Sequence, residues 1–161
     1  MNKFLKNLLT FSMILSIGFF SACSNDNEDE KDDRNAVVIN KKNETALLLC
    51  SFGSTYEQPQ ATYDQIIKDY QAAFPNTDIY MSFTSRTIIS RVYAQIGKAY
   101  SQPDLWLSAI GKAGYKNVYI QSLHIIPGEE YLSLMNTDVK KNFMIASFPN
   151  IEVLKGANLL A

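Results

Sequence analysis

Short apolar runs alternate with amphipathic segments through most of the chain. Residues 45–52 (T-A-L-L-L-C-S-F) form a continuous apolar run, which is typical of a strand that is covered on both faces of a parallel sheet. Between such runs, apolar residues recur at the spacing of one helix face. The pattern predicts strands at residues 45–52, 78–83, 117–123 and 151–154. It predicts helices at residues 58–74, from a cap at Thr84 or Ser85 to residue 96, at 101–114 and at 128–147.

The predicted strands and helices follow one another in the order βα, βαα, βα, β. This order favours an α/β fold, in which a four-stranded parallel sheet lies between two layers of helices. Ligands of such open sheets bind outside the carboxyl ends of the strands. The three loops at those ends are polar: G-S-T-Y-E at 53–57, T-S-R at 84–86, and a third that holds His124 and P-G-E-E-Y. We therefore expect hydroxyls, an arginine, a histidine and carboxylates to converge on one edge.

The first 22 residues have the pattern of a targeting segment. Two lysines precede an apolar run of 13 residues, from Leu8 to Phe20, which is shorter than the roughly 20 residues that a membrane-spanning helix needs. F-S-A-C at residues 20–23 resembles the lipobox of bacterial lipoproteins. That resemblance implies cleavage before Cys23 and lipidation of its thiol, whereas an ordinary signal peptide with a chance cysteine is the alternative.

Residues 23–44 are expected to be a lipidated cysteine and a flexible tether. The run S-N-D-N-E-D-E-K-D-D-R-N at 24–35 cannot bury apolar surface, and its like charges repel one another. It resembles the surface-export signal of some Gram-negative lipoproteins, but a plain spacer fits equally well. We expect an exported, membrane-anchored lipoprotein on the periplasmic or the outer-membrane and cell-surface side.

The composition limits the chemistry of the remaining domain, residues 45–161. The full chain has a net charge of −1, which gives no broad surface for nucleic acid. Lipidation of Cys23 would leave Cys50, in an apolar run, as a small buried hydrophobe. The sequence has one histidine, no Gly-rich phosphate loop, and no arrangement that His124 could complete as a Ser-His-Asp triad. The sequence therefore gives no motif for phosphate binding or for a serine-hydrolase mechanism.

Three motifs together carry a resemblance to a known family. S-F-G-S-T-Y at 51–56, F-T-S-R-T-I-I at 83–89 and Q-S-L-H-I-I-P-G-E-E-Y at 121–131 resemble the anaerobic sirohydrochlorin cobaltochelatases, class II chelatases related to ferrochelatase. The resemblance spans residues 45–161, and the third motif is the most specific. It implies a chelatase-like (flavodoxin-like) lobe and insertion of Co²⁺ into a sirohydrochlorin-like tetrapyrrole in anaerobic cobalamin biosynthesis. The resemblance also implies that no organic cofactor takes part.

The family has two lobes with the tetrapyrrole in the cleft between them, and its principal metal-binding and proton-accepting histidines lie in the second lobe. Residues 151–161 correspond to the end of the first lobe, so we expect this lobe alone and assign no certain catalytic residue. A second lobe from elsewhere or a homo-oligomer would complete the site. Whether this metal chelatase (lyase) would be active without them stays open.

The resemblance assigns two residues to the metal. Glu130 matches the acidic position that faces the metal region, although carboxylates after a Pro-Gly turn also simply favour a helix start, the role expected of Glu129. His124 matches the motif histidine and is either a metal or haem contact or a hydrogen-bonded support. One histidine with one carboxylate is too few ligands for a tight transition-metal site.

The same resemblance assigns substrate contacts to the other two loops. Ser54, Thr55, Tyr56 and Ser85 would donate hydrogen bonds to the substrate, and turn or helix-cap chemistry is their alternative role. Arg86 would pair with a propionate or acetate of the macrocycle, or lie solvated on its helix. A second hypothesis, from a different class of function, is that the protein is exported and binds a tetrapyrrole, haem or metal without catalysis. A third hypothesis is that the chain is a remnant with no independent function.

Overall fold

Four parallel strands form the sheet of the computed structural model, which describes residues 37–140 and 147–160. The strands are β1 (Thr45–Ser51), β2 (Thr77–Phe83), β3 (Asn117–Ser122) and β4 (Glu152–Lys155), in the order β2-β1-β3-β4. Each bound lies within one residue of its prediction, and the predicted four-stranded parallel sheet of an α/β fold is confirmed. The expected leader, Cys23 and most of the expected tether lie outside the described residues.

The helices begin and end where local chemistry favours it. The Ser85 side chain accepts a hydrogen bond from the Ile88 N–H at the start of α3 (Arg86–Ile96), and Gly97 ends that helix with a φ of 67°. Pro103 opens α4 (Pro103–Lys112). The first helix, α2 (Glu57–Ala73), stops just before Phe74 and Pro75.

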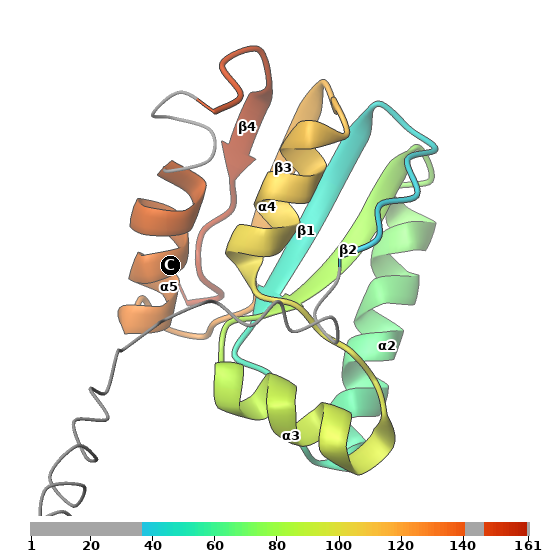
Figure 1. Cartoon of the computed structure of the whole chain (residues 1–161), viewed down its shortest axis with the longest axis vertical. Helices are drawn as coiled ribbons and strands as arrows, with labels where there is room; N and C mark the ends of the chain where they lie inside the picture. Colours follow the sequence, from blue (N-terminus) through green and yellow to red (C-terminus); the bar gives the residue numbers. More distant parts are fainter. Residues whose placement is uncertain (1–36, 141–146, 161) are drawn as a thin grey trace, which may run out of the picture. The chain divides into compact units, whose positions relative to one another are not determined.

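Two apolar clusters, one on each face of the sheet, make three layers. Leu48 and Cys50 of β1 point to the face covered by α4 and the helical segment after β3. Leu47 and Leu49 point to the face covered by α2 and α3. The helix α4 packs against β1 and β2, and α2 packs against β2 (Figure 1). Burial, followed by the charge of Asp138, raises the pKa of the Cys50 thiol, which therefore behaves as the buried hydrophobe that the sequence predicts.

The segment after β3 differs from the single helix predicted at 128–147. It consists of α5 (Glu129–Ser133) and a π-helical turn, η2 (Leu134–Asp138), and residues 141–146 lie outside the described part. In a π turn, residue i bonds residue i+5, and the Val139 N–H accordingly bonds the Leu134 carbonyl. The wider turn brings Leu134, Met135 and Val139 to the same side, where all three are buried.

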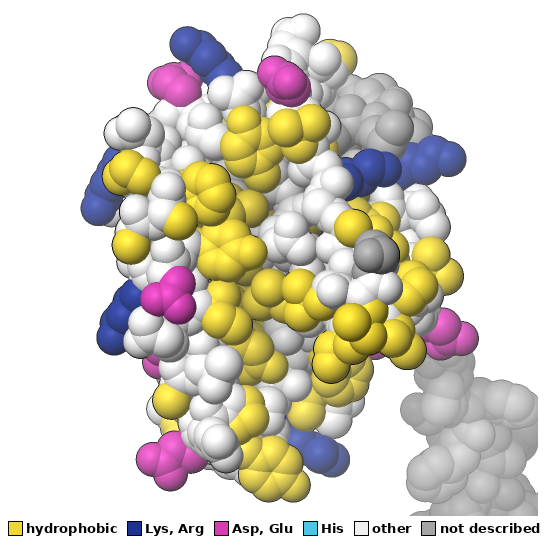
Figure 2. All heavy atoms as spheres, turned by 180° about the vertical axis from the view of Figure 1, so that it is seen from behind, with side chains coloured by type: hydrophobic (Ala, Val, Ile, Leu, Met, Phe, Trp, Pro, Cys, Tyr) yellow, Lys and Arg dark blue, Asp and Glu magenta, His cyan; other side chains and the backbone are white. Residues whose placement is uncertain are grey.

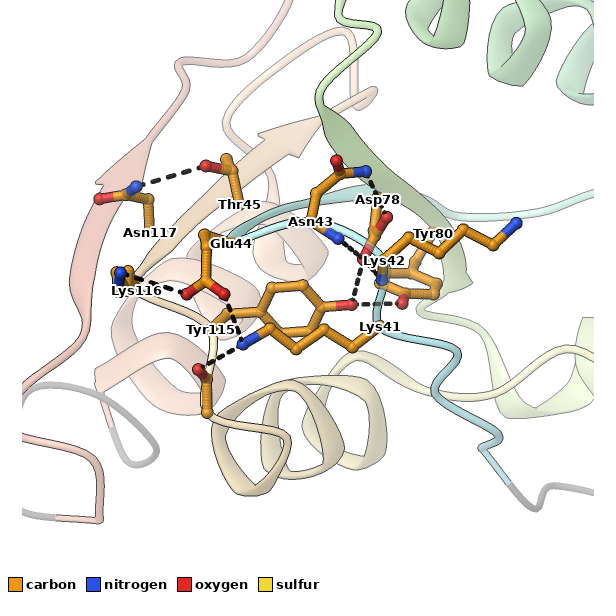
Figure 3. A network of polar contacts seen from close by, with 11 residues as sticks. Lys41, Lys42, Asn43, Glu44, Thr45, Asp78, Tyr80, Tyr115, Lys116 and Asn117 are labelled. Atoms are coloured by element: carbon orange, nitrogen blue, oxygen red, sulfur yellow. Dashed lines mark hydrogen bonds and ion pairs between the residues drawn. The ribbon is translucent and has the colours of Figure 1, made fainter.

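A polar network at the amino edge of the sheet fixes the chain just before β1 (Figure 3). Asp78 accepts hydrogen bonds from the backbone N–H groups of Lys42 (2.8 Å) and Asn43 (3.2 Å), from Asn43 Nδ2 (2.8 Å) and from the Tyr115 hydroxyl (2.7 Å). The Tyr115 and Tyr80 hydroxyls lie 2.6 Å apart. These contacts hold residues 42–43, which lie within the segment expected to be a tether, on the folded domain.

The sheet face that α2 and α3 cover keeps apolar side chains at the surface near β4, where Leu154 lies in register with Tyr119 and Leu47. Figure 2 shows them gathered on the side that α4 and α5 do not cover. Parallel sheets are normally covered on both faces, yet Leu154 of β4 is 54% exposed. Among residues 37–140 and 147–160, no helix combines the length and hydropathy that crossing a membrane requires.

Candidate functional site

The three polar loops begin side by side at the carboxyl edge of the sheet. The Thr84 N–H donates to the Ser51 carbonyl (2.8 Å), and the Leu123 N–H donates to the Cys50 carbonyl (2.7 Å). These bonds continue the pairing of β1 with β2 and with β3 past the strand ends. The predicted convergence of the loops is therefore confirmed.

The strand order places these loops at a topological switch point. From β1 the chain runs to β2 on one side of it, then crosses to β3 on the other side. The crossover connections leave in opposite directions there, which opens a crevice above the strand ends where α/β proteins bind ligands. Loops 53–57 and 124–128 flank this point.

A pocket of about 140 Å³ lies between the second and third loops. It brings together Arg86, at the start of α3, and Glu130, in the first turn of α5. The sequence resemblance assigned Arg86 to a carboxylate of the macrocycle and Glu130 to the metal. The structure places both side chains in the lining of one pocket. The rest of its polar lining comes from Thr84, Gln102, Asp104, Ser133 and Asp138.

Arg86 is fixed at one end of its guanidinium group. Its Nε donates to Gln102 Oε1 at 2.9 Å, and in the described part of the chain it makes no ion pair. The terminal nitrogens therefore remain for a ligand. A planar guanidinium binds carboxylates through two parallel N–H groups, so the pocket offers a carboxylate site beside its own acidic groups.

The two glutamates after Gly128 differ in position. Glu130 is partly buried and lines the pocket, whereas Glu129 is exposed. Both carboxylates lie in the first turn of α5. The role of Glu130 toward a metal stays a prediction.

His124 is held between two hydroxyl groups beneath the site. Its Nδ1 lies 2.8 Å from Ser122 Oγ, which also accepts a hydrogen bond from the His124 N–H (3.1 Å), and its Nε2 lies 3.4 Å from Thr84 Oγ1. Burial lowers the pKa of His124, while the charge of Glu130 acts in the opposite direction. The net effect favours the neutral imidazole more than in an ordinary histidine.

We predict that Glu130→Gln lowers the pKa of His124 further, because it removes the charge that favours the imidazolium. An NMR titration reads this directly, since His124 is the chain's only histidine. In the folded chain the pKa of His124 lies below the ordinary 6.5. As the pH falls, the unfolded chain therefore binds the proton at a higher pH than the folded chain does. The free energy of unfolding decreases as the pH drops through that window. Glu129→Gln is the control and should leave the titration unchanged; an equal shift in both variants would contradict this geometry.

The first loop contributes a separate surface. Ser54 Oγ accepts from the Tyr56 N–H (3.2 Å), and Tyr56 is 76% exposed beside an open hollow that it shares with the start of α2. Ser54, Thr55 and Tyr56 do not line the Arg86–Glu130 pocket. The Ser85 side chain caps α3, so it takes part in helix capping as well as lying near the site. The substrate roles of these four residues stay predictions.

The described residues hold no ready metal site. Within 37–140 and 147–160, no three side chains among His, Cys, Asp and Glu lie close enough together to hold a metal ion. Glu130 and His124 interact through charge but are not brought into a common ligand set. Any ion received by Glu130 would need further ligands from the substrate or from another part of the protein.

Sequence reasoning did not assign several residues that shape the site. Ser122 and Thr84 orient His124, and Gln102 orients Arg86. The signal for Ser122 was its place two residues before His124 at a strand end. Gln102 gave no such signal, because its contact with Arg86 joins residues 16 positions apart.

Comparisons with known proteins agree with this geometry. The sequence model of a family described as "Cobalt chelatase (CbiK)" matches residues 45–157. The chain is 37% identical over 87 residues to the sirohydrochlorin cobaltochelatase of Salmonella typhimurium, covering 53% of this chain and 33% of the relative. It is 35% identical over 92 residues to the sirohydrochlorin cobaltochelatase CbiKC of Nitratidesulfovibrio vulgaris, covering 55% of this chain and 31% of the relative.

The matched region includes every strand of the sheet and all three polar loops. The matches span about a third of the length of these curated relatives. The family model, however, matches well over half of the chain. The chain belongs to the cobalt chelatase (CbiK) family.

Proposed function

We propose that the chain supplies one lobe of a sirohydrochlorin cobaltochelatase-type protein, which inserts Co²⁺ into a sirohydrochlorin-like tetrapyrrole. The observation that carries the proposal is the pocket that joins Arg86 to Glu130, between the loop that follows β2 and the segment that follows β3. Family membership supports it, as do the names of the two relatives, both sirohydrochlorin cobaltochelatases.

The reaction requires groups that this edge provides in part. Two pyrrole N–H protons leave as the ring nitrogens bind Co²⁺, so the products are the metallated ring and two protons. Arg86 would bind a peripheral carboxylate of the macrocycle, and the hydroxyls of Ser54, Thr55 and Tyr56 would donate to others. Glu130 would face the incoming cation and favour its approach. The chain's own share is thus to bind and orient the substrate and the ion.

The proposal is tested by adding sirohydrochlorin, and then Co²⁺, to the full chain in a constant concentration of mild detergent. We expect the visible spectrum to shift on binding of the macrocycle. Bands of the cobalt complex that grow faster than without protein would support chelation by this chain. Absence of any binding would overturn the proposal.

Arg86→Gln is expected to weaken sirohydrochlorin binding about tenfold, because a charge-assisted hydrogen-bond pair to a carboxylate is lost. The measurement is a spectral titration of the dissociation constant. Arg91→Gln is the matched control, since Arg91 is an exposed arginine on the same helix. Equal affinities of the Arg86 variant and the control would remove Arg86 from the binding site.

A non-catalytic exported protein that binds a tetrapyrrole or haem is the second candidate. It is favoured by the lack of a three-residue metal site among the described residues and by the lipobox-like F-S-A-C. Binding of sirohydrochlorin or haem without acceleration of cobalt insertion would select this function over chelation.

We also propose that Cys23 is lipidated and anchors the protein to a membrane. The support is the sequence pattern of residues 1–23. The intact mass of the protein from a lipoprotein-processing bacterial host tests this. A mass equal to that of the unprocessed chain, or of a chain cleaved elsewhere, would contradict it.

The exposed apolar face of the sheet gives a reason to propose a further partner. A second lobe or a second copy that packs on the side of Leu154 would bury it, as parallel sheets require. Sedimentation of the full chain distinguishes self-association from a monomer that awaits another lobe.

A further inference from the structure

Gln60 lies buried in the first turns of α2, beneath the loop that follows β1. It is 8% exposed and is the one residue of α2 that is fully buried. Glutamine is mostly found at the surface, and a buried amide costs free energy unless its groups are hydrogen-bonded. Its position therefore calls for a specific set of partners.

Both ends of the Gln60 amide are used. Nε2 donates to the Ser54 carbonyl at 2.5 Å, and Oε1 accepts from the Tyr100 hydroxyl at 2.9 Å. A side chain that acts as donor on one side and acceptor on the other fits these partners. A glutamate would lack the donor at neutral pH, a methionine of similar length lacks both groups, and an asparagine is one methylene shorter.

Tyr100 is itself rigidly held. It is 6% exposed, and its ring stacks on Phe83 with the ring centroids 3.8 Å apart. Lys98 Nζ lies 5.2 Å from the Tyr100 ring centroid and 2.6 Å from Asp64 Oδ1 on α2. Gln60 is thus attached to a fixed point in the segment between α3 and α4.

The ring of Phe83, on which Tyr100 stacks, also supports the 53–56 loop. A Cβ atom on Gly53 would lie 2.6 Å from the Phe83 ring, so the loop backbone rests directly on that ring. The loop is therefore held at Gly53 by packing and at Ser54 by the Gln60 amide. These two anchors restrict the backbone that carries the hydroxyl groups at positions 54–56.

We infer that Gln60 is a positioning residue, which fixes the 53–56 loop for substrate binding by linking the Ser54 carbonyl to Tyr100. The inference rests on the proposed function of that loop as a tetrapyrrole contact. Gln60 acts through the loop and does not line the Arg86–Glu130 pocket. Fixing the loop in the unliganded protein lowers the entropy that substrate binding must remove.

The test compares Gln60→Met with the wild type in the full chain. We expect backbone amide exchange at residues 53–56 to become about tenfold faster, since one buried hydrogen bond to the loop is lost. We expect the dissociation constant for sirohydrochlorin to rise by about the same factor. Tyr100→Phe removes one bond of the link and should change both quantities in the same direction, by less.

Tyr115→Phe is the matched control, because it removes a buried phenol hydrogen bond at the opposite edge of the sheet. It should lower overall stability while leaving loop exchange and sirohydrochlorin affinity unchanged. A merely structural role for Gln60 would make its variant behave like this control, which would overturn the inference. If Gln60→Met does not fold, Tyr100→Phe decides by the same comparison.

The failure of the proposed function is recognisable separately. If the wild-type chain binds no sirohydrochlorin, the proposed function is wrong, and the positioning role in substrate binding is wrong with it. If the wild type binds and both variants keep wild-type affinity and loop exchange, only the inference about Gln60 is wrong.

Discussion

Asp78→Ala is expected to lower the free energy of unfolding by about 3 kcal/mol at pH 7. The carboxylate accepts hydrogen bonds from two backbone N–H groups, the Asn43 amide and the Tyr115 hydroxyl. Alanine leaves these donors without their acceptor in a site where Asp78 is only 9% exposed. Chemical denaturation followed by circular dichroism measures the loss.

The effect of Asp78 should depend on pH in a defined direction. Burial alone would raise the pKa of Asp78, but hydrogen bonds from Tyr115, from the Lys42 and Asn43 N–H groups and from the Asn43 side chain outweigh it and lower the pKa. The stabilisation is therefore fully present above the unfolded value of 3.8 and is lost as the pH falls through the lower folded value. The difference between wild type and Asp78→Ala should shrink in that acidic window.

Glu44→Gln is the control for this prediction. Glu44 lies on the same segment, and its carboxylate pairs with Lys41 (3.4 Å) and Lys116 (3.6 Å) while its side chain is 57% exposed. Exposed ion pairs contribute little, so this variant should stay within about 0.5 kcal/mol of the wild type. A loss from Asp78→Ala no larger than that of the control would show that the amino-edge network does not hold the domain together.

The strands and the edge that carries the site could be predicted because they depend on local pattern. A continuous apolar run such as residues 45–52 is typical of a strand that is buried on both faces, which favours a parallel sheet and, with it, the edge where the loops meet. The cap at Ser85 was also predictable, since a hydroxyl before a helical pattern satisfies a free N–H group.

The features that could not be predicted depend on contacts between distant parts of the chain. The π turn at residues 134–138 replaces an α-helical turn because Leu134 and Val139 must enter the same core, and helical periodicity does not report this. Asp78 reads as an ordinary strand-start residue until Tyr115, 37 positions away, is placed against it. Gln60 likewise reads as a surface residue, because helix propensity does not distinguish a buried glutamine from an exposed one.

The largest effect at the site itself is expected from Gly53→Ala, which should cost about 3 kcal/mol of stability. Gly53 has a φ of 95°, which side-chain-bearing residues rarely adopt. Its added Cβ would also lie 2.6 Å from the Phe83 ring. Phe83 is fully buried between Tyr63 and Tyr100, with ring-centroid distances of 5.0 Å and 3.8 Å, so the ring cannot move aside.

The backbone must therefore shift, and the 53–56 loop should lose its conformation together with its affinity for a macrocycle. Gly97→Ala separates backbone strain from the steric clash with Phe83. Gly97 also has a positive φ (67°), but nothing lies within 4 Å of an added Cβ there. It should cost only about 1 kcal/mol, the strain of the left-handed conformation alone. Thermal denaturation and loop amide exchange of both variants measure the difference. The contrary result is that the two variants are equally destabilising, with amide exchange at the 53–56 loop unchanged in both. Contact between Gly53 and Phe83 would then not determine the conformation of this edge of the sheet.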